Sequence, residues 1–160
     1  MIKINVISVG KIKEKYLKDA CAEYLKRLMG FAKVNVIEVG EFRSSDNPSS
    51  AEIEQVKQKE GEAIIAKIPK GSFVISMCIE GGQLSSEELS QKLSSITLNG
   101  ISEITFIIGG SFGLSDEVKT ASDLRLSFGK ITLPHQLMRV VLLEQIYRAF
   151  TIMNNTKYHK

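Results

Sequence analysis

Hydrophobic residues follow two patterns along the chain, and stretches of the two patterns alternate. Short runs rich in valine and isoleucine predict strands, whereas apolar residues spaced three or four positions apart predict amphipathic helices. Strands are predicted at residues 2–9, 34–39, 73–79, 104–108 and 124–128. Helices are predicted at residues 14–29, 49–68, 85–98 and 134–153, with a short one after Ser115. Five strand–helix repeats predict an α/β domain in which helices flank a mainly parallel sheet.

Local signals mark where several of these helices begin. Ser49 with Glu52, and Ser85 with Glu88, have the spacing of a capping box. Pro134 suits the first turn of the last helix, because its missing N–H would have no partner there. These signals agree with the hydrophobic pattern and support the same boundaries.

The last predicted helix is apolar around most of its circumference. Its apolar residues are Leu137, Met138, Val140, Val141, Leu142, Leu143 and Ile146. A helix of this kind must be buried on more than one side. One side can pack on the sheet, and we expect the other to meet a second subunit. The sequence therefore predicts a homodimer through the C-terminal helix, with two-fold symmetry as the commonest closed arrangement.

Length and composition are those of an ordinary globular protein. The chain has 160 residues, of which 43% are hydrophobic and 24% charged, and we expect residues 1–160 to form one domain. No stretch approaches the roughly 18 consecutive apolar residues that a membrane span requires. Residues 1–6 alternate apolar and polar side chains, unlike a signal peptide. We therefore expect a cytoplasmic protein without a membrane partner.

Cysteine and histidine are too few and too scattered to form a metal site. Cys21 and Cys78 lie far apart in apolar surroundings, so we interpret both as buried thiols. His135 and His159 have no Cys or His nearby in the sequence. No metal is therefore expected.

Charge is distributed unevenly although the net charge is only +3. Residues 1–43 carry nine Lys/Arg and five Asp/Glu, and residues 147–160 carry three basic residues and no acidic one. Residues 44–146 carry nine basic and thirteen acidic residues. If the two ends of the chain meet, they form a basic face suited to a polyanion. Two separate solvated faces are the simpler interpretation.

Three predicted strands run into unusual turns. These turns are residues 80–82, 109–113 and 128–135, and each contains glycine. In a parallel sheet the strand-to-helix turns share the carboxyl edge, where ligands bind. Any one glycine turn can be merely tight, but three on one edge predict a ligand site.

The motifs in these turns exclude several classes of site. The dinucleotide spacing G-x-G-x-x-G is absent, and no Gly-Lys-Ser/Thr forms a phosphate loop. Residues 109–113 do match G-x-S-x-G, the nucleophile elbow of hydrolases, with Ser111 as the nucleophile. Asp116 or Asp123, and then His135, follow in the hydrolase order. A small serine hydrolase therefore stays open, although the chain is short for that fold.

The third turn has a different character. Residues 128–133 offer apolar side chains and backbone groups but no general base. Such a pocket suits a flat heterocycle such as adenine, held by main-chain hydrogen bonds and apolar contact.

A long segment around this turn resembles one protein family. Residues 126–149 read LSFGKITLPHQLMRVVLLEQIYRA, which closely resembles the signature of the RlmH-type SPOUT (trefoil-knot) family, the 23S ribosomal RNA pseudouridine-N3 methyltransferases. Residues 9–13, 109–111 and 158–160 also agree, and the resemblance covers the whole chain. It implies S-adenosyl-L-methionine as methyl donor and a trefoil knot in the C-terminal half.

The resemblance also implies roles for individual residues. The implied donor-binding residues are Met77, Gly109, Phe128, Gly129, Lys130, Ile131, Thr132 and Leu133. His135 is a weak candidate for a catalytic base, and it could instead cap the last helix. Arg139 could bind phosphate or the carboxylate of the donor, with an ion pair on the helix as the alternative.

The C-terminal residues are the remaining candidates for contact with RNA. Tyr158 and His159 can stack on a base while Lys157 and Lys160 meet phosphates, although a frayed terminus is the usual state of such a tail. The resemblance implies ribosomal RNA in the assembled ribosome as the partner. A serine hydrolase and a non-catalytic RNA-binding domain remain the alternatives to the methyltransferase.

Overall fold

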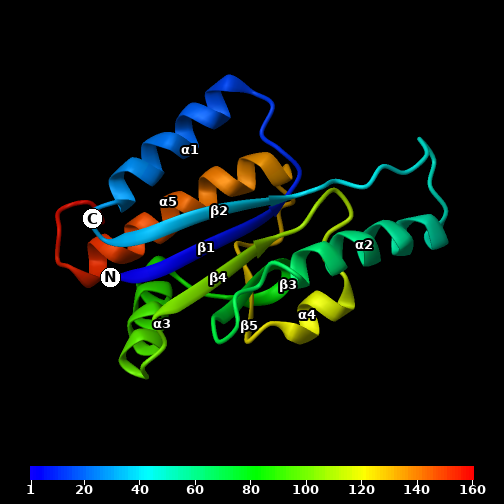
Figure 1. Ribbon diagram of the computed structural model, residues 1–160. Helices are drawn as coiled ribbons and strands as arrows, with labels where there is room; N and C mark the ends of the chain where they lie inside the picture. The colour runs from blue at the N-terminus through cyan, green and yellow to red at the C-terminus, as the bar shows by residue number, and fades with distance from the viewer.

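The computed structural model describes residues 1–160 and contains five strands and five helices (Figure 1). The strands are β1 (Ile2–Val9), β2 (Ala32–Val39), β3 (Phe73–Gln83), β4 (Glu103–Ile108) and β5 (Leu124–Ser127). The helices are α1 (Lys15–Leu28), α2 (Ser50–Ile65), α3 (Ser86–Leu98), α4 (Asp116–Ala121) and α5 (His135–Met153). The predicted α/β class and the five strand–helix repeats are confirmed.

All five strands belong to one sheet in the order β2-β1-β4-β3-β5, and every pairing is parallel. The turns that follow β1, β4 and β5 therefore lie at the same edge. The trefoil knot that the resemblance implies stays a prediction.

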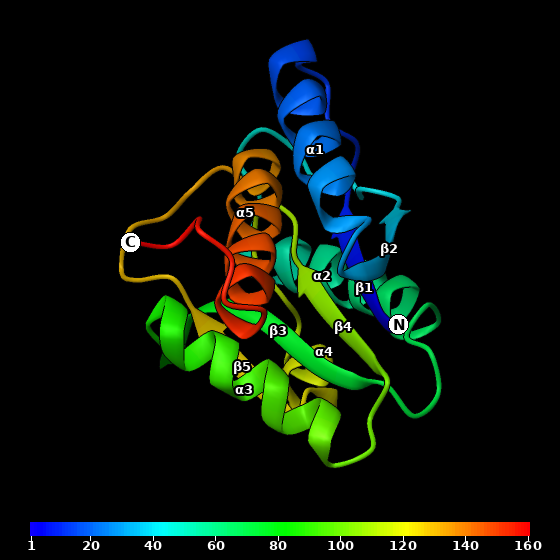
Figure 2. The same cartoon turned by 90° about the vertical axis from the view of Figure 1, so that its left-hand side faces the viewer.

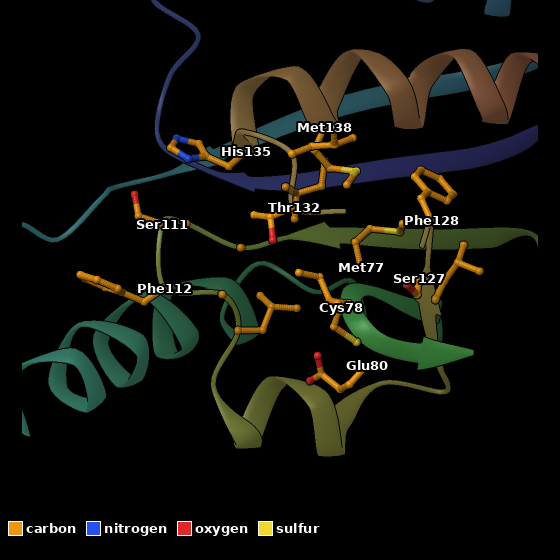
Figure 3. A pocket seen from close by; sticks show the side chains of 18 of the residues that line it. Met77, Cys78, Glu80, Ser111, Phe112, Ser127, Phe128, Thr132, His135 and Met138 are labelled. Atoms are coloured by element: carbon orange, nitrogen blue, oxygen red, sulfur yellow. The ribbon is translucent and has the colours of Figure 1, made fainter. Parts of the chain in front are cut away.

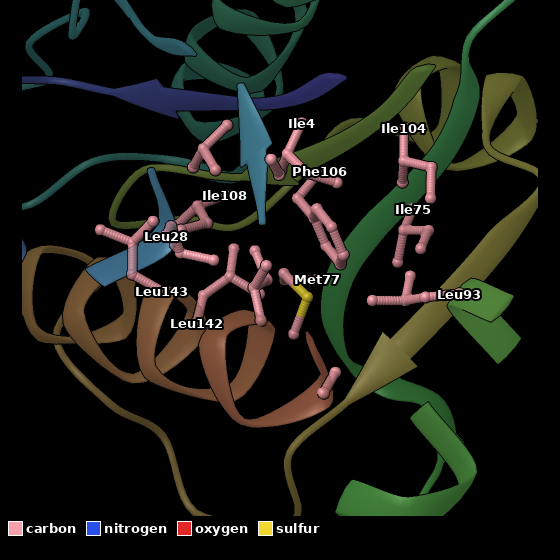
Figure 4. Packing of buried hydrophobic residues seen from close by; sticks show 14 of the residues in the cluster. Ile4, Leu28, Ile75, Met77, Leu93, Ile104, Phe106, Ile108, Leu142 and Leu143 are labelled. Carbon is pink, nitrogen blue, oxygen red and sulfur yellow. The ribbon is translucent and has the colours of Figure 1, made fainter. Parts of the chain in front are cut away.

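Helices cover both faces of the sheet in two layers (Figures 1 and 2). On one face, α5 lies between α1 and α3 and packs against both. On the other face, α2 packs against α4. The larger core cluster joins the sheet to the three-helix layer, and Figure 4 shows Leu142 and Leu143 of α5 facing Ile4 and Phe106. A smaller cluster that includes Ile7 fills the α2 and α4 side.

Both predicted helix starts are confirmed, but only the second one forms a complete capping box. The hydroxyl of Ser49 accepts a hydrogen bond from the N–H of Glu52. Ser85 and Glu88 form the complete reciprocal box. Pro134 differs slightly from the prediction, because it is the residue before the first turn of α5 and has an extended ψ of 138°.

One predicted turn is wrong. Residues 80–82 do not leave the sheet, because β3 continues through them to Gln83. The pairing is interrupted instead, since Met77 and Gly82 both pair with Leu126 and the residues between them bulge out. A Cβ on Gly81 would lie 2.7 Å from the carbonyl carbon of Arg125. Glycine is therefore needed there so that the backbones of β3 and β5 can approach each other.

No helix of the structure is both long enough and apolar enough to span a membrane.

Candidate functional site

A cavity of about 410 Å³ opens at the carboxyl edge of the sheet (Figure 3). Its walls come from β3, the turn after β4, the loop after β5 and the start of α5. Seven of the eight predicted donor-binding residues line it, namely Met77, Gly109, Phe128, Gly129, Ile131, Thr132 and Leu133. Lys130 is the exception, because it is exposed and lies outside the lining. The volume lies within the roughly 300–1,000 Å³ typical of small-molecule sites.

The turn after β4 forms one wall, and we call residues Gly109–Gly113 the donor turn. A Cβ on Gly109 would lie 2.9 Å from the carbonyl carbon of Gly113. The turn therefore folds back on its own backbone, which also forms an isolated bridge between Gly110 and Gly113. Gly113 has a φ of +82°, a conformation that favours glycine. The sequence pattern thus builds a rigid wall of backbone rather than of side chains.

The loop after β5 forms the facing wall and is shaped by one serine. The hydroxyl of Ser127 accepts a hydrogen bond from the N–H of Gly129 and donates one to its carbonyl oxygen, each at 3.1 Å. Gly129 has a φ of +121°, which a residue with a side chain adopts only under strain. Ser127 is buried, so this turn is fixed from inside the protein. Because the buried Ser127 hydroxyl holds the backbone of the loop, its apolar side chains can face a ligand.

Sequence reasoning missed several lining residues. Lys57 comes from α2, Lys119 from α4, and Met138 from one turn beyond His135. Cys78 and Ile79 reach the cavity because the interrupted pairing of β3 turns them outward. Met138 could have been predicted, because it lies one helical turn after His135 and so on the same side of α5. The two lysines could not, because their place at the cavity depends on how α2 and α4 pack against the sheet.

Few groups at the cavity can accept a proton at neutral pH. Lys119 forms an ion pair with Glu80, and this contact lowers the pKa of the Glu80 carboxyl. Burial, and next the nearby Glu80, raise the pKa of the Cys78 thiol. His135 lines the cavity at the start of α5 and has no hydrogen-bond partner. Its side chain does not cap the helix, so that alternative is wrong.

The hydrolase arrangement is not formed. Ser111 is exposed on the donor turn, and no hydrogen bond joins it to His135. The carboxylate of Asp123 accepts a hydrogen bond from the N–H of Val74 at 2.8 Å, so it secures β3 instead of orienting a histidine. No histidine contacts the Ser111 hydroxyl, and no carboxylate orients His135. Ser111 therefore lacks the groups that would activate it as a nucleophile.

Arg139 lies inside the protein and is not at an RNA-accessible surface. Only 4% of it is exposed. One guanidinium nitrogen contacts Glu38 Oε2 at 2.7 Å, and another donates to the carbonyl oxygen of Gly10 at 3.1 Å. The ion-pair alternative therefore describes this residue, although its partner lies on β2 and not on the helix. Its contact with RNA stays a prediction that this burial disfavours.

The C-terminal tail is folded against α5 and α3, contrary to the frayed state usual for such a segment. We call residues 154–160 the tail. The hydroxyl of Tyr158 donates to Glu144 Oε1 at 3.1 Å, and its ring packs edge-on against Tyr147. Burial above all, together with this hydrogen bond, raises the pKa of Tyr158 to about 12. The two basic ends of the chain meet here, because the Arg27 guanidinium of α1 lies 5.7 Å from the centre of the Tyr147 ring.

His159 ties the tail to both neighbouring helices. Its Nδ1 lies 3.1 Å from a guanidinium nitrogen of Arg148, and its Nε2 lies 2.6 Å from Glu87 Oε1. Because arginine can only donate, Nδ1 is the acceptor and Nε2 carries the proton. Tyr158 and His159 are half-buried, whereas Lys160 is exposed.

A partly exposed apolar strip remains beside the cavity. Ile131 is 81% exposed and Leu137 is 36% exposed, and Val141 of the same helix is half-buried. Much of the rest of α5 packs against the sheet, α1 and α3, while Glu144 and Arg148 are half-buried and contact the tail. The predicted dimer would have to use this strip, and it stays a prediction. No group of three or more His, Cys, Asp or Glu side chains that could hold a metal ion is present.

Comparison with known proteins agrees with this architecture. A methylase family protein from Haemophilus influenzae Rd KW20 superposes with a TM-score of 0.51 over 99% of this chain and 70% of its own, at 16% sequence identity. A methylase family protein from Neisseria gonorrhoeae superposes with the same score over 98% of this chain and 95% of its own, at 10% identity. At such identities the likeness concerns the fold alone.

Sequence similarity goes further. The family model described as "Predicted SPOUT methyltransferase" matches residues 2–159, and the chain belongs to this family of methyltransferases. Proteins named "Ribosomal RNA large subunit methyltransferase H" from Streptococcus sanguinis and Carboxydothermus hydrogenoformans are 54% and 55% identical to it. Each alignment covers 99% of this chain and all of the relative. The resemblance inferred from residues 126–149 is thereby confirmed.

Proposed function

We propose that the protein transfers a methyl group from S-adenosyl-L-methionine to N3 of a pseudouridine in 23S ribosomal RNA within the assembled ribosome. One observation carries the proposal above all. In a chain that matches ribosomal RNA methyltransferases along its whole length, seven of the eight predicted donor-binding residues line one cavity whose walls combine backbone turns with apolar side chains.

The donor fits the chemistry of these walls. The side chains of Phe128, Leu133 and Met138 offer apolar surface for an adenine ring, and the backbone of the loop after β5 offers hydrogen bonds to its edge. When bound, S-adenosyl-L-methionine would supply an electrophilic methyl group on its sulfonium, with the neutral thioether as the leaving group when the methyl passes to N3. The protein's main tasks are then to orient the two reactants and to exclude water.

The target N3–H must lose its proton during the transfer, and we propose His135 as the acceptor. The carboxylate of Glu80 is engaged by Lys119 and is a weakened base, and the Cys78 thiol is held in its neutral form by burial. Both lysines at the cavity are engaged in ion pairs, Lys119 with Glu80 and Lys57 with Glu54. His135 is therefore the cavity residue best able to take the proton.

The surfaces around the site suggest how the substrate is held. We propose that Tyr158, His159 and Lys160 contact the RNA and that the strip around Leu137 forms a homodimer in the cytoplasm. Arg139 could take part only after leaving its contacts with Glu38 and Gly10.

Isothermal titration calorimetry with S-adenosyl-L-methionine tests the donor site. The Thr132→Trp variant should fill the cavity and abolish binding, since Thr132 is an exposed lining residue. The matched Thr120→Trp variant changes an exposed threonine of α4 outside the cavity and should bind normally. Failure of the folded wild-type protein to bind the donor would refute the proposal.

Methylation of ribosomes tests the reaction itself. Ribosomes that lack the modification should accept radiolabelled methyl groups at one pseudouridine of 23S RNA, and His135→Gln should lower kcat without changing donor affinity. Label found on another nucleotide, or on protein, would contradict the assigned substrate.

A further inference from the structure

A buried carboxyl group lies beside the donor turn without belonging to the donor cavity. Glu60 of α2 is 2% exposed and forms no ion pair. Its Oε2 accepts a hydrogen bond from the N–H of Phe42 at 3.1 Å. Its Oε1 is enclosed and has no partner at all. A buried acceptor without a partner costs stability, so its presence calls for an explanation.

The same carboxyl group touches the donor turn. A Cβ on Gly110 would lie 2.9 Å from Oε1 and 3.3 Å from Oε2 of Glu60. Both oxygens therefore pack directly against the Gly110 backbone, where only glycine leaves room. Gly110 also lines the donor cavity. Glu60 is thus the carboxyl group that supports this wall from behind.

On its other side, Glu60 holds the segment between β2 and α2, residues 40–49, which we call the β2–α2 loop. Phe42, whose N–H is held by Glu60, is 40% exposed. Together with Arg43 it lines a second cavity of about 220 Å³, and Glu60 lines the same cavity. Ser111 and Phe112 line both cavities. The loop and the donor turn therefore meet with Glu60 beneath them.

The loop carries groups that suit RNA. Arg43 can contact a phosphate, and the exposed ring of Phe42 can stack on an unpaired base. Lys59 of α2 lies with its ammonium 5.8 Å from the centre of the same ring and adds positive charge. These groups line or flank the second cavity, which shares Ser111 and Phe112 with the donor cavity.

We propose that Glu60 is a positioning residue that couples the β2–α2 loop to the donor turn. The inference rests on the proposed function. Donor binding restricts the motion of the Gly110 backbone, and the Glu60 carboxyl group packed against it is then restricted as well. Because Glu60 accepts a hydrogen bond from the N–H of Phe42, the β2–α2 loop also becomes more ordered. Phe42 and Arg43 are then in place for the RNA when the methyl donor is present.

Hydrogen exchange measured with and without S-adenosyl-L-methionine tests this coupling. In the wild-type protein the donor should slow amide exchange in both the donor turn and the β2–α2 loop. In Glu60→Ala the donor should protect the donor turn alone. In Glu60→Gln, whose amide oxygen can still accept the Phe42 N–H, protection of the loop should be retained. The matched control Glu62→Ala, an exposed position on the same helix, should behave as the wild type.

A second variant keeps the test valid if Glu60→Ala folds poorly. Phe42→Pro removes the backbone N–H and leaves Glu60 intact, so it should also confine protection to the donor turn. Glu60→Ala should raise KM for ribosomes about 10- to 100-fold, the scale of misplaced reactants, with donor affinity changed less than threefold. Phe42→Pro also removes the ring proposed to stack on RNA, so its test is hydrogen exchange alone.

The outcomes separate this inference from the proposed function. If the donor binds the wild type and protects the donor turn but never the loop, the coupling is refuted and the methyltransferase assignment stands. If the donor does not bind to the folded wild-type protein, both the coupling and the proposed function are refuted. If Glu60→Gln loses loop protection as Glu60→Ala does, a hydrogen bond is not what links the two segments, and the proposal is overturned.

Discussion

The donor cavity and the C-terminal tail, two regions with expected roles in one reaction, are built in opposite ways. Backbone turns form the cavity. A side chain at Gly109 would collide with the backbone of Gly113, and Gly129 has a positive φ that other residues rarely adopt. Side chains form the tail region, where Glu144 alone accepts hydrogen bonds from Arg148, Gln145 and Tyr158. The cavity should therefore be sensitive to the volume of a substituted residue, and the tail to the charge of its residues.

The largest effect should follow from a bulky residue in the donor turn. Gly109→Val places a side chain 2.9 Å from the backbone of Gly113 and 3.0 Å from Leu114. We expect a loss of about 1–3 kcal/mol of unfolding free energy from overpacking, together with loss of donor binding. Thermal unfolding and calorimetry measure the two effects.

Gly30→Ala is the control for this substitution, because no atom lies within 4 Å of the added Cβ. It should unfold and bind the donor as the wild type does. If Gly109→Val bound the donor normally, the wall would not be defined by its backbone.

A smaller effect, confined to the tail, should follow from Glu144→Ala. Two nitrogens of Arg148 lie 3.0 and 2.6 Å from Glu144 Oε1, and the variant loses these bonds and that of Tyr158. We expect a loss of about 1–2 kcal/mol, the scale of hydrogen bonds to charged groups. Limited proteolysis should cut the tail faster, while donor affinity stays unchanged. Reduced donor affinity would mean that the two regions are not independent.

Two carboxyl groups next to these regions, Glu60 beside the donor turn and Glu87 beside the tail, should respond to pH in opposite directions. Burial above all, with Glu41 of the β2–α2 loop as a further cause, raises the pKa of Glu60 above its ordinary 4.5. The folded state therefore favours the protonated carboxyl, and the wild type loses stability relative to Glu60→Gln as pH rises from 4.5 through the raised pKa. Unfolding curves of both proteins between pH 4 and 8 measure this difference. If the wild type instead gained stability relative to Glu60→Gln as pH rises, the raised pKa of Glu60 would be contradicted.

The smallest effect should be seen at Glu87. The hydrogen bond with His159 is the main cause that lowers the pKa of this exposed carboxyl below 4.5. Its contribution is present above pH 4.5 and is lost as pH falls through the lowered pKa. At a pH below the lowered pKa, a protease active in acid should therefore cut the tail of the wild type as fast as it cuts the tail of Glu87→Gln. At neutral pH the tail of the wild type should be cut more slowly. Equal sensitivity of the two proteins at pH 7 would refute the contribution.

The sequence predicted the fold closely because its local signals agree with its hydrophobic pattern. The capping boxes at Ser49 and Ser85 and the strand-like runs gave nearly every boundary. Residues 80–82 misled the prediction, since Gly81 and Gly82 resemble a turn. Gly81 instead permits a close approach to the backbone of Arg125, and such a long-range contact between strands leaves no local signal.

The candidate site was predicted in part. The glycine turns identified the edge of the sheet, and the family resemblance identified Met77 and the loop after β5. The burial of Arg139 could not be foreseen, because its partner Glu38 is 101 residues away in the sequence. Glu60 escaped notice for a similar reason, since on a helix a glutamate between Lys59 and Gly61 looks like an ordinary solvated residue.

The place of α5 between α1 and α3 has a consequence for how the protein is made. Leu142, Leu143 and Ile146 of α5 complete a core whose first members lie in β1. During synthesis at about 5–20 residues per second, β1, β2, β3 and β4 all emerge seconds before the helix that covers them. The nascent sheet therefore has an uncovered apolar face for that time, and this is the stage at which chaperone contact or aggregation should be greatest.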